Sequence, residues 1–212
     1  MTAAVEELLI AHAAGKLAEP VALIVATHLA LNPASRARYR RYEAVGGALL
    51  ESIEPAGLSP GALEGVLARL DEAGPDDPPP PRAAVPAPLP APLRDYLPAP
   101  LDRLRWRNYG SIAQFDLPLR APGYRARLIR LKAGRAVPRH THVGSELTLV
   151  LEGSFHDEIG HYRRGDLALA DRAIDHQPVA DPGRDCLCLA VTDAPLRLTG
   201  AIGRFLNPFI RA

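Results

Sequence analysis

Four side chains between residues 140 and 176 have the types and spacing of a metal-binding set. They are three imidazoles and one carboxylate: His140, His142, Glu146 and His176. The first three lie in the pattern Gly134-x5-His140-x-His142-x3-Glu146-x6-Gly153, and the fourth closes the pattern Gly165-x10-His176. Three nitrogen ligands and one oxygen ligand suit a zinc, iron, manganese or nickel ion. The spacing predicts one divalent metal ion and leaves open whether that ion does chemistry, holds structure or senses a signal.

Short β-strands are expected to position these ligands. Residues i and i+2 of a strand face the same side, so His140 and His142 can both point into a barrel. Glu146 enters the following strand, and His176 comes from a strand distant in sequence. The region 101–212 contains short apolar runs separated by Gly, Pro and Asp turns, at 126–131, 146–151, 167–170 and 186–192. This pattern predicts an antiparallel sandwich or barrel.

Two further pairs of side chains could add chemistry to the metal site. His156 and His161 could serve an enzyme as acid–base groups, but their acidic neighbours and a nearby turn favour solvated hairpin residues. Cys186 and Cys188 share one strand face. Small apolar core residues are the favoured interpretation of this pair, and oxidisable thiols near the metal are the alternative.

Composition excludes several classes of function. The 25 basic residues nearly balance the 24 acidic ones, which argues against direct nucleic-acid binding or attachment to a membrane surface. The N-terminus lacks a signal-peptide pattern, and the longest apolar stretch, 21–31, is too short to span a bilayer. Two cysteines cannot build a disulfide scaffold, so a cytoplasmic location is expected.

The chain is predicted to have two domains and a linker. Residues 1–73 carry four amphipathic segments with Asn-Pro and Ser-Pro start signals, which predict a small helical bundle with a thin core. Eleven of the 22 prolines fall between residues 75 and 100. Residues 74–100 are therefore expected to form an extended linker, at about 3.1 Å per residue, that separates the helices from the β domain at 101–212.

The metal-binding patterns resemble the cupin family. The first pattern matches the family's first motif at every fixed position. The second matches at Gly165 and His176, with other residues at three turn positions. The resemblance implies a jelly-roll β-barrel in which His140, His142, Glu146 and His176 hold the ion. The predicted fold class is thus α + β, with a small helical bundle followed by a cupin jelly-roll β-barrel.

Nearly the whole chain outside the linker resembles the ChrR family of zinc-binding anti-sigma factors. The resemblance is carried by LLIAHAAGKL, by VATHLALNPASRARYRRYEAVGGALLE, and by HQPVADP followed by DCLCLA. It implies a non-enzymatic regulator whose helices bind an extracytoplasmic-function sigma factor and block its contact with RNA polymerase. It also implies a cupin domain, with zinc as its first-choice metal, linked to sigma-factor release under oxidative stress, notably singlet oxygen. Homodimerisation through the cupin domain is left open.

One departure from that family concerns its helical zinc site. The family uses H-x3-C-x2-C plus an earlier histidine, whereas this chain has His28-x3-Asn32-x2-Ser35 and no histidine before His12. An amide and a hydroxyl are poor replacements for two thiolates on zinc. The sequence therefore predicts no zinc in the helical domain, and whether sigma-factor binding survives that loss is an open question.

Other functions remain to be separated from the regulator. The third predicted helix carries a basic stretch made of Arg36, Arg38, Arg40 and Arg41. This stretch is either a solvated helix face or a surface that binds an acidic protein partner. A metal-dependent cupin enzyme of the dioxygenase type, with a vestigial helical domain, is the alternative function. A cupin that senses a small molecule is a third.

Overall fold

The computed structural model describes residues 3–72, 89–119 and 121–199. The four predicted helices are present as α1 (Ala3–Ala13), α2 (Glu19–Leu31), α3 (Pro33–Glu51) and α4 (Ala62–Glu72). The start of α3 follows its sequence signal, because Asn32 Oδ1 accepts the Ser35 N–H at 3.0 Å with Pro33 in the first turn. Among the described residues, no helix is long and apolar enough to cross a membrane.

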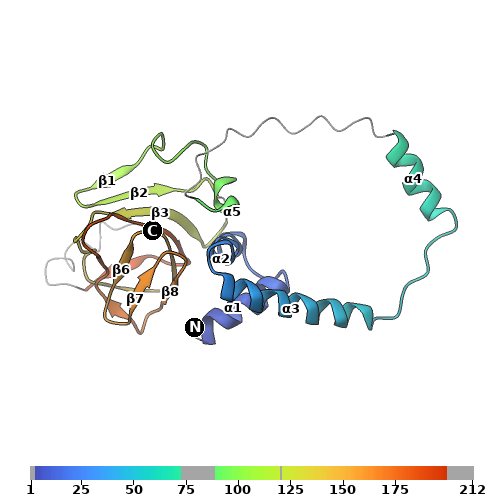
Figure 1. Ribbon diagram of the computed structural model, residues 1–212, viewed down its shortest axis with the longest axis horizontal. Coiled ribbons are helices and arrows are strands. Elements are labelled where there is room, and N and C mark those ends of the chain that lie inside the picture. Colours follow the sequence, from blue (N-terminus) through green and yellow to red (C-terminus); the bar gives the residue numbers. More distant parts are fainter. Residues whose placement is uncertain (1–2, 73–88, 120, 200–212) are drawn as a thin grey trace.

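Helix α2 joins the helical and β parts of the chain through one hydrophobic core. Most of its residues are buried, as expected of a helix that is apolar all round. It contacts strands β5 (Glu146–Glu152) and β11 (Cys186–Thr192) as well as its helical neighbours (Figure 1). The shared core includes Ile24, Val25, Leu128, Leu149 and Leu189. The expectation of two domains held apart by a linker is therefore wrong for α1–α3.

Part of the predicted linker is packed instead of extended. Residues 73–88 lie outside the described residues, but residues 91–94 form a short helix, α5 (Ala91–Arg94), against α2. Leu89 and Leu93 are buried in the shared core. These leucines explain the difference, because an apolar side chain every few residues can be buried even in a proline-rich segment. The predicted end of the linker at residue 100 is too late.

Twelve strands lie in the described part of the chain, and the four predicted runs correspond to β3, β5, β8 and β11. The ones not yet named are β1 (Arg107–Tyr109), β2 (Ile112–Asp116), β3 (Arg125–Leu131), β4 (His140–His142), β6 (Ser154–His156), β7 (His161–Arg163), β8 (Leu167–Ala170), β9 (Asp175–His176), β10 (Val179–Ala180) and β12 (Leu196–Leu198). All pairings are antiparallel, in a six-stranded sheet of order β1-β2-β3-β11-β5-β8 and two three-stranded sheets, β10-β6-β7 and β12-β4-β9.

The large sheet separates two apolar clusters. Alternate residues face opposite sides, so Leu149 packs toward the helices while Val150 faces the interior of the β domain. That interior cluster also contains Phe155, Cys186 and Cys188. Strand β11 is buried along its whole length because it has packed side chains on both faces. The arrangement is that of a cupin jelly roll, and the predicted fold class is confirmed.

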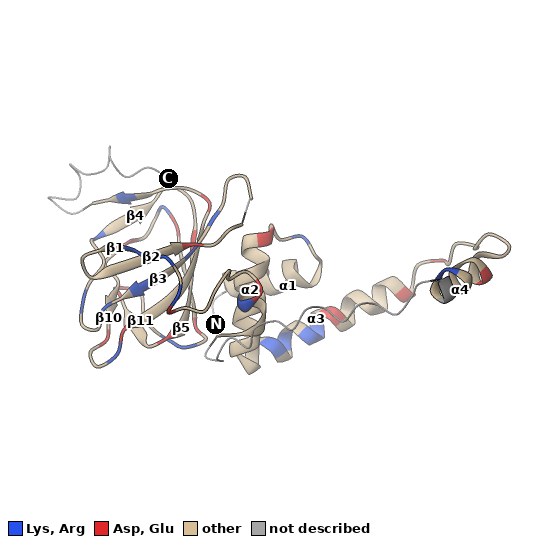
Figure 2. Ribbon diagram, turned by 90° about the horizontal axis from the view of Figure 1, so that it is seen from above, with Lys and Arg blue, Asp and Glu red and all other residues tan. Residues whose placement is uncertain are grey.

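The outer half of α3 and all of α4 differ from the predicted bundle. Tyr39 and Tyr42 pack against the shared core, but Val45 and Leu49, on the same predicted stripe, are exposed. Helix α4 stands apart from α1–α3 (Figures 1 and 2). The helices themselves are confirmed, while the apolar faces expected to meet in a bundle core are open.

Candidate metal centre

The four predicted metal ligands come together at one end of the β domain. His140 and His142 lie on β4, which pairs with β9 so that His140 is opposite His176. Glu146 begins β5. One ligand atom from each residue can be chosen so that all four lie within 4.8 Å of one another. The three imidazoles are buried and Glu146 is half-buried. Among the described residues, no other group of His, Cys, Asp and Glu side chains is arranged to hold a metal ion.

Hydrogen bonds fix the orientation of two of the rings. The Nδ1–H of His140 donates to the carbonyl of Pro138 at 2.8 Å, and the Nδ1 of His176 is 2.8 Å from the Asp157 carboxylate. The side chain of Asp157 is 2% exposed and also accepts the N–H groups of Ile159 and Gly160. Each ring therefore keeps its Nε2 lone pair for an ion, which is the arrangement that supports histidine ligands in metal sites.

The spacing of the imidazole nitrogens fits a bound ion. His142 Nε2 and His176 Nε2 are 3.2 Å apart. Two nitrogens on a tetrahedral zinc ion, each about 2.05 Å from it, would be about 3.3 Å apart. Burial lowers the pKa of His140 and of His142, which favours the neutral form that binds metal. The residues present thus fit a transition metal, and the donor set alone does not choose among zinc, iron, manganese and nickel.

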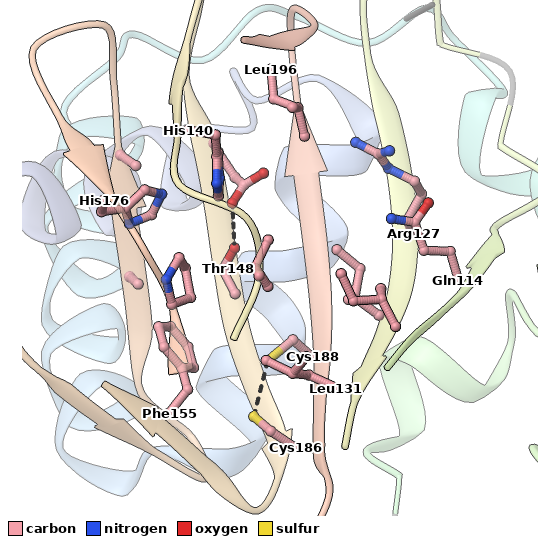
Figure 3. Close-up of a pocket in the computed structure, with 17 residues that line it drawn as sticks. Gln114, Arg127, Leu131, His140, Thr148, Phe155, His176, Cys186, Cys188 and Leu196 are labelled. Carbon is pink, nitrogen blue, oxygen red and sulfur yellow. Dashed lines mark hydrogen bonds between the residues drawn. The ribbon is translucent and has the colours of Figure 1, made fainter. Parts of the chain in front are cut away.

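The four candidate metal ligands, which we call the metal cluster, border a cavity of about 90 Å³ inside the jelly roll (Figure 3). His140, Glu146 and His176 line one side of it, and Cys186 and Cys188 line its floor. The two sulfur atoms are 3.6 Å apart and both thiols are free. The hydrogen bond to Cys186 and burial raise the pKa of Cys188, so the thiol form is held. The cysteines are core residues, as favoured, that also face the cavity.

His156 and His161 lie outside this cavity. Both are exposed, and both hydrogen-bond the carboxylate of Asp181, His156 through Nδ1 at 2.9 Å and His161 through Nε2 at 2.5 Å. Ser154 adds a third hydrogen bond to the same carboxylate. These bonds hold the pKa of Asp181 well below its usual range. The structure thus places the pair on the β6–β7 hairpin. The residue that sequence reasoning did not identify is Asp157, whose carboxylate bonds His176.

The altered helical motif forms a hydrogen-bonded joint, which consists of His28, Ser35 and the carbonyl of Gly165. His28 is 3% exposed and Ser35 is 2% exposed. His28 Nδ1 must carry the proton, because it is 2.8 Å from the carbonyl of Gly165, which can only accept. Its Nε2 lies 2.8 Å from Ser35 Oγ and, in the neutral ring, accepts that hydroxyl. Burial lowers the pKa of His28 and keeps the ring neutral.

This joint crosses from the helical part to the β domain. Gly165 precedes β8, and its φ of +91° suits glycine. An added Cβ there would lie 3.3 Å from Leu31 at the end of α2, so the two backbones approach closely. Asn32, the other replaced ligand position, caps α3. Because His28 uses both ring nitrogens, the three residues have hydrogen-bonding roles that need no ion.

The remaining residues singled out in the helices also have packing or pairing roles. His12 packs on Tyr39, with ring centroids 5.3 Å apart, and it belongs to no group of three or more candidate metal ligands in the described residues. Arg36 donates to carbonyls at the end of α2, and Arg38 pairs with Glu6 of α1. Exposed basic side chains on α3 remain at Arg38, Arg40 and Arg41 (Figure 2).

Comparison with known proteins agrees with this architecture. Residues 100–195 match the model of the ChrR cupin-like domain. The anti-sigma-E factor ChrR of Cereibacter sphaeroides is 46% identical over 207 residues, covering 97% of this chain and 96% of that protein. The crystal structure of Rhodobacter sphaeroides SigE in complex with the anti-sigma ChrR superposes with a TM-score of 0.76 at 45% identity, covering 88% of this chain and 96% of that chain. These matches favour a regulator over a cupin enzyme. The chain belongs to the ChrR family of anti-sigma factors.

Proposed function

We propose that this protein sequesters an extracytoplasmic-function sigma factor in the cytoplasm through α3 and α4, without a zinc ion in its helical part. The metal-binding cupin domain would sense oxidative stress or a small ligand and control release. The relative described above is an anti-sigma factor, and the solved structure of ChrR contains SigE. Family membership supports the role, and the surface of the helices supports the mode of binding.

The observation that carries this proposal is an exposed apolar surface on α3, α4 and their connection. Nine large apolar side chains there are 50–84% exposed: Val45, Leu49, Leu50, Ile53, Leu58, Leu63, Val66, Leu67 and Leu70. Four of them form a single stripe along α4. Single exposed leucines are ordinary, but two helices that each present such a face are expected to be covered by a partner.

The loss of the family's zinc site does not remove this surface. The first half of α3 is fixed by the His28–Ser35 joint, the Asn32 cap and packing against the shared core. The outer half and α4 project from that anchor (Figure 1). Packing and hydrogen bonds can therefore present the binding face in place of zinc.

Co-purification with the sigma factors encoded beside this protein tests the proposal. Replacing Leu63 and Leu67 by glutamate places two charges on the α4 stripe, and we expect at least tenfold weaker binding. Ala68→Glu, on the opposite face of α4, is the matched control and should bind normally. Since all three side chains are exposed, none of these changes should lower the stability of the free chain. Unchanged binding by the double variant would refute the proposed surface.

We further infer that the cupin domain holds one divalent ion, zinc by family analogy, on His140, His142, Glu146 and His176. The orientation of the rings and the 3.2 Å spacing of two Nε2 atoms support this assignment. Metal analysis of purified protein should find one ion per chain, and His140→Ala should remove it. A metal content that is unaffected by His140→Ala would contradict the assignment.

A further inference from the structure

The cavity beside the metal cluster contains a cationic side chain with an unpaired donor. Arg127 projects from β3 into the cavity, across from His140 and His176, and Gln114 of β2 lies next to it (Figure 3). The Nε of Arg127 is buried and has no hydrogen-bond partner in the part of the chain that the structure describes. Its Nη2 makes only a long contact of 3.4 Å with Thr192 Oγ1. A buried guanidinium donor without an acceptor is unfavourable and indicates a group that is still to bind.

No carboxylate of the described residues pairs with this arginine. Asp116 is opposite Arg127 in the strand register, but its carboxylate pairs with Arg107 instead. Glu146 also lines the cavity, but it accepts the hydroxyl of Thr148 and belongs to the metal cluster. Within the described residues, the positive charge of Arg127 is therefore left facing the cavity.

The rest of the cavity is apolar and small. Ile112, Ile129, Leu131 and Val137 are among its lining residues. A cavity of about 90 Å³ is several times the roughly 10–15 Å³ that one water needs, so it has room for a small ligand. An apolar pocket with a few polar groups at fixed positions is typical of a small-molecule site. A single guanidinium beside an amide matches one carboxylate, whereas a phosphate monoester would need more donors.

We propose that this cavity binds a small aliphatic carboxylate, with the carboxylate on Arg127 and Gln114 and the hydrocarbon chain against the apolar wall. Occupancy of the cavity places such a ligand directly beside the metal cluster. The proposal names a ligand class for the sensing role proposed above and rests on it for biological meaning. Binding itself requires no sigma factor, so failure of one proposal is distinguishable from failure of the other.

Calorimetry on the full-length, metal-loaded protein tests this assignment. The probes are butyrate, its neutral analogue butyramide and its cationic analogue n-butylamine. Butyrate should bind at least tenfold more tightly than butyramide, and butylamine should not bind. Loss of a charge-assisted hydrogen bond in Arg127→Gln should weaken butyrate binding about ten- to a hundredfold and leave butyramide unchanged. Arg127→Lys, which retains the charge, should recover part of the loss.

Two controls keep the result specific. Arg125→Gln changes an exposed arginine on the same strand and should leave butyrate binding as it is in the parent protein. The metal content of each arginine variant must equal that of the parent, which shows that the domain has folded. Equal affinity for butyrate and butyramide would overturn the proposal, as would butyrate binding that is unaffected by Arg127→Gln. Butyrate binding lost in His140→Ala but kept in Arg127→Gln would assign the carboxylate to the metal alone and overturn the role of Arg127.

Discussion

The joint between His28, Ser35 and Gly165 yields the sharpest prediction about stability. In this protein hydrogen bonds occupy the positions at which its family places zinc ligands. If these hydrogen bonds stabilise the fold in the absence of zinc, replacing His28 or Ser35 should destabilise the chain without any change in metal content. If a zinc ion is held there, the same changes should lower both.

The expected size of the effect follows from burial and from the two bonds. His28→Ala removes two buried hydrogen bonds of about 1 kcal/mol each. It also leaves the Gly165 carbonyl without its partner and opens a space beneath α2, which adds about 1–2 kcal/mol. The total is about 3–4 kcal/mol in the free energy of unfolding. Ser35→Ala removes the bond to His28 and leaves the His28 Nε2 unpaired, which costs about 1–2 kcal/mol.

Urea unfolding of the full-length protein measures these values, and a double-mutant cycle isolates the His28–Ser35 bond. The coupling energy should be about 1 kcal/mol. Arg40→Ala, a change on the exposed face of α3, is the control and should lie within about 0.5 kcal/mol of the parent protein. Asn32→Ala should cost about 1 kcal/mol through the lost helix cap alone.

Metal analysis in a His140→Ala background decides between the joint and a zinc site. The cupin site is then disabled, so the remaining metal reports on the helices. We expect almost none, and we expect added zinc to leave the unfolding curve in place. About one zinc ion per chain in this background, lost on His28→Ala, would refute the reasoning. So would a His28–Ser35 coupling energy indistinguishable from zero.

Three further predictions concern the supports of the metal site and the response to acid. Asp157→Asn should weaken metal binding about ten- to a hundredfold by metal titration, because the carboxylate orients His176. Asp181→Asn should lower the free energy of unfolding by about 1 kcal/mol at pH 7. The difference in stability between this variant and the parent should shrink below about pH 4. The pKa of Asp181 is lowered in the folded state, so the carboxylate stabilises the fold only while it is ionised. Burial lowers the pKa of His28 in the folded state, so stability should fall as pH drops below about 6.5, and His28→Gln should flatten this slope.

Sequence patterns predicted the elements and the grouping of the four candidate metal ligands because both depend on local spacing. Asn32 followed by proline marks a helix start wherever the helix packs. His140 and His142 face one side because strand geometry requires it, and Glu146 begins β5 as expected. The glycines of the motifs fit turns that other residues adopt with strain. Gly153 has a φ of +71°, and a Cβ there would lie 2.5 Å from the Asp185 carbonyl.

What the sequence did not predict depends on contacts between distant segments. Asp157 looked like an ordinary acidic hairpin residue, and only the packing of that hairpin brings it to His176. The uniform apolarity of α2 was the one available signal that this helix is covered on several faces, and it predicts burial without naming the partner. Arg127 showed no sequence signal, since alternating arginines on a strand are ordinarily solvent-facing.

The hydrogen bonds of His28 tie the start of α3 to α2 and to the β domain without requiring an ion. Two thiolates and two histidines within the helices would form a site closed on itself. Here the buried histidine of α2 donates instead to Gly165, at the start of β8, and β8 pairs with β5 so that Ala170 is opposite Glu146. A hydrogen bond of 2.8 Å is lost when its partners separate by about 1 Å. A movement of about 1 Å at Gly165 would therefore break the bond that ties His28 of α2 to the β domain.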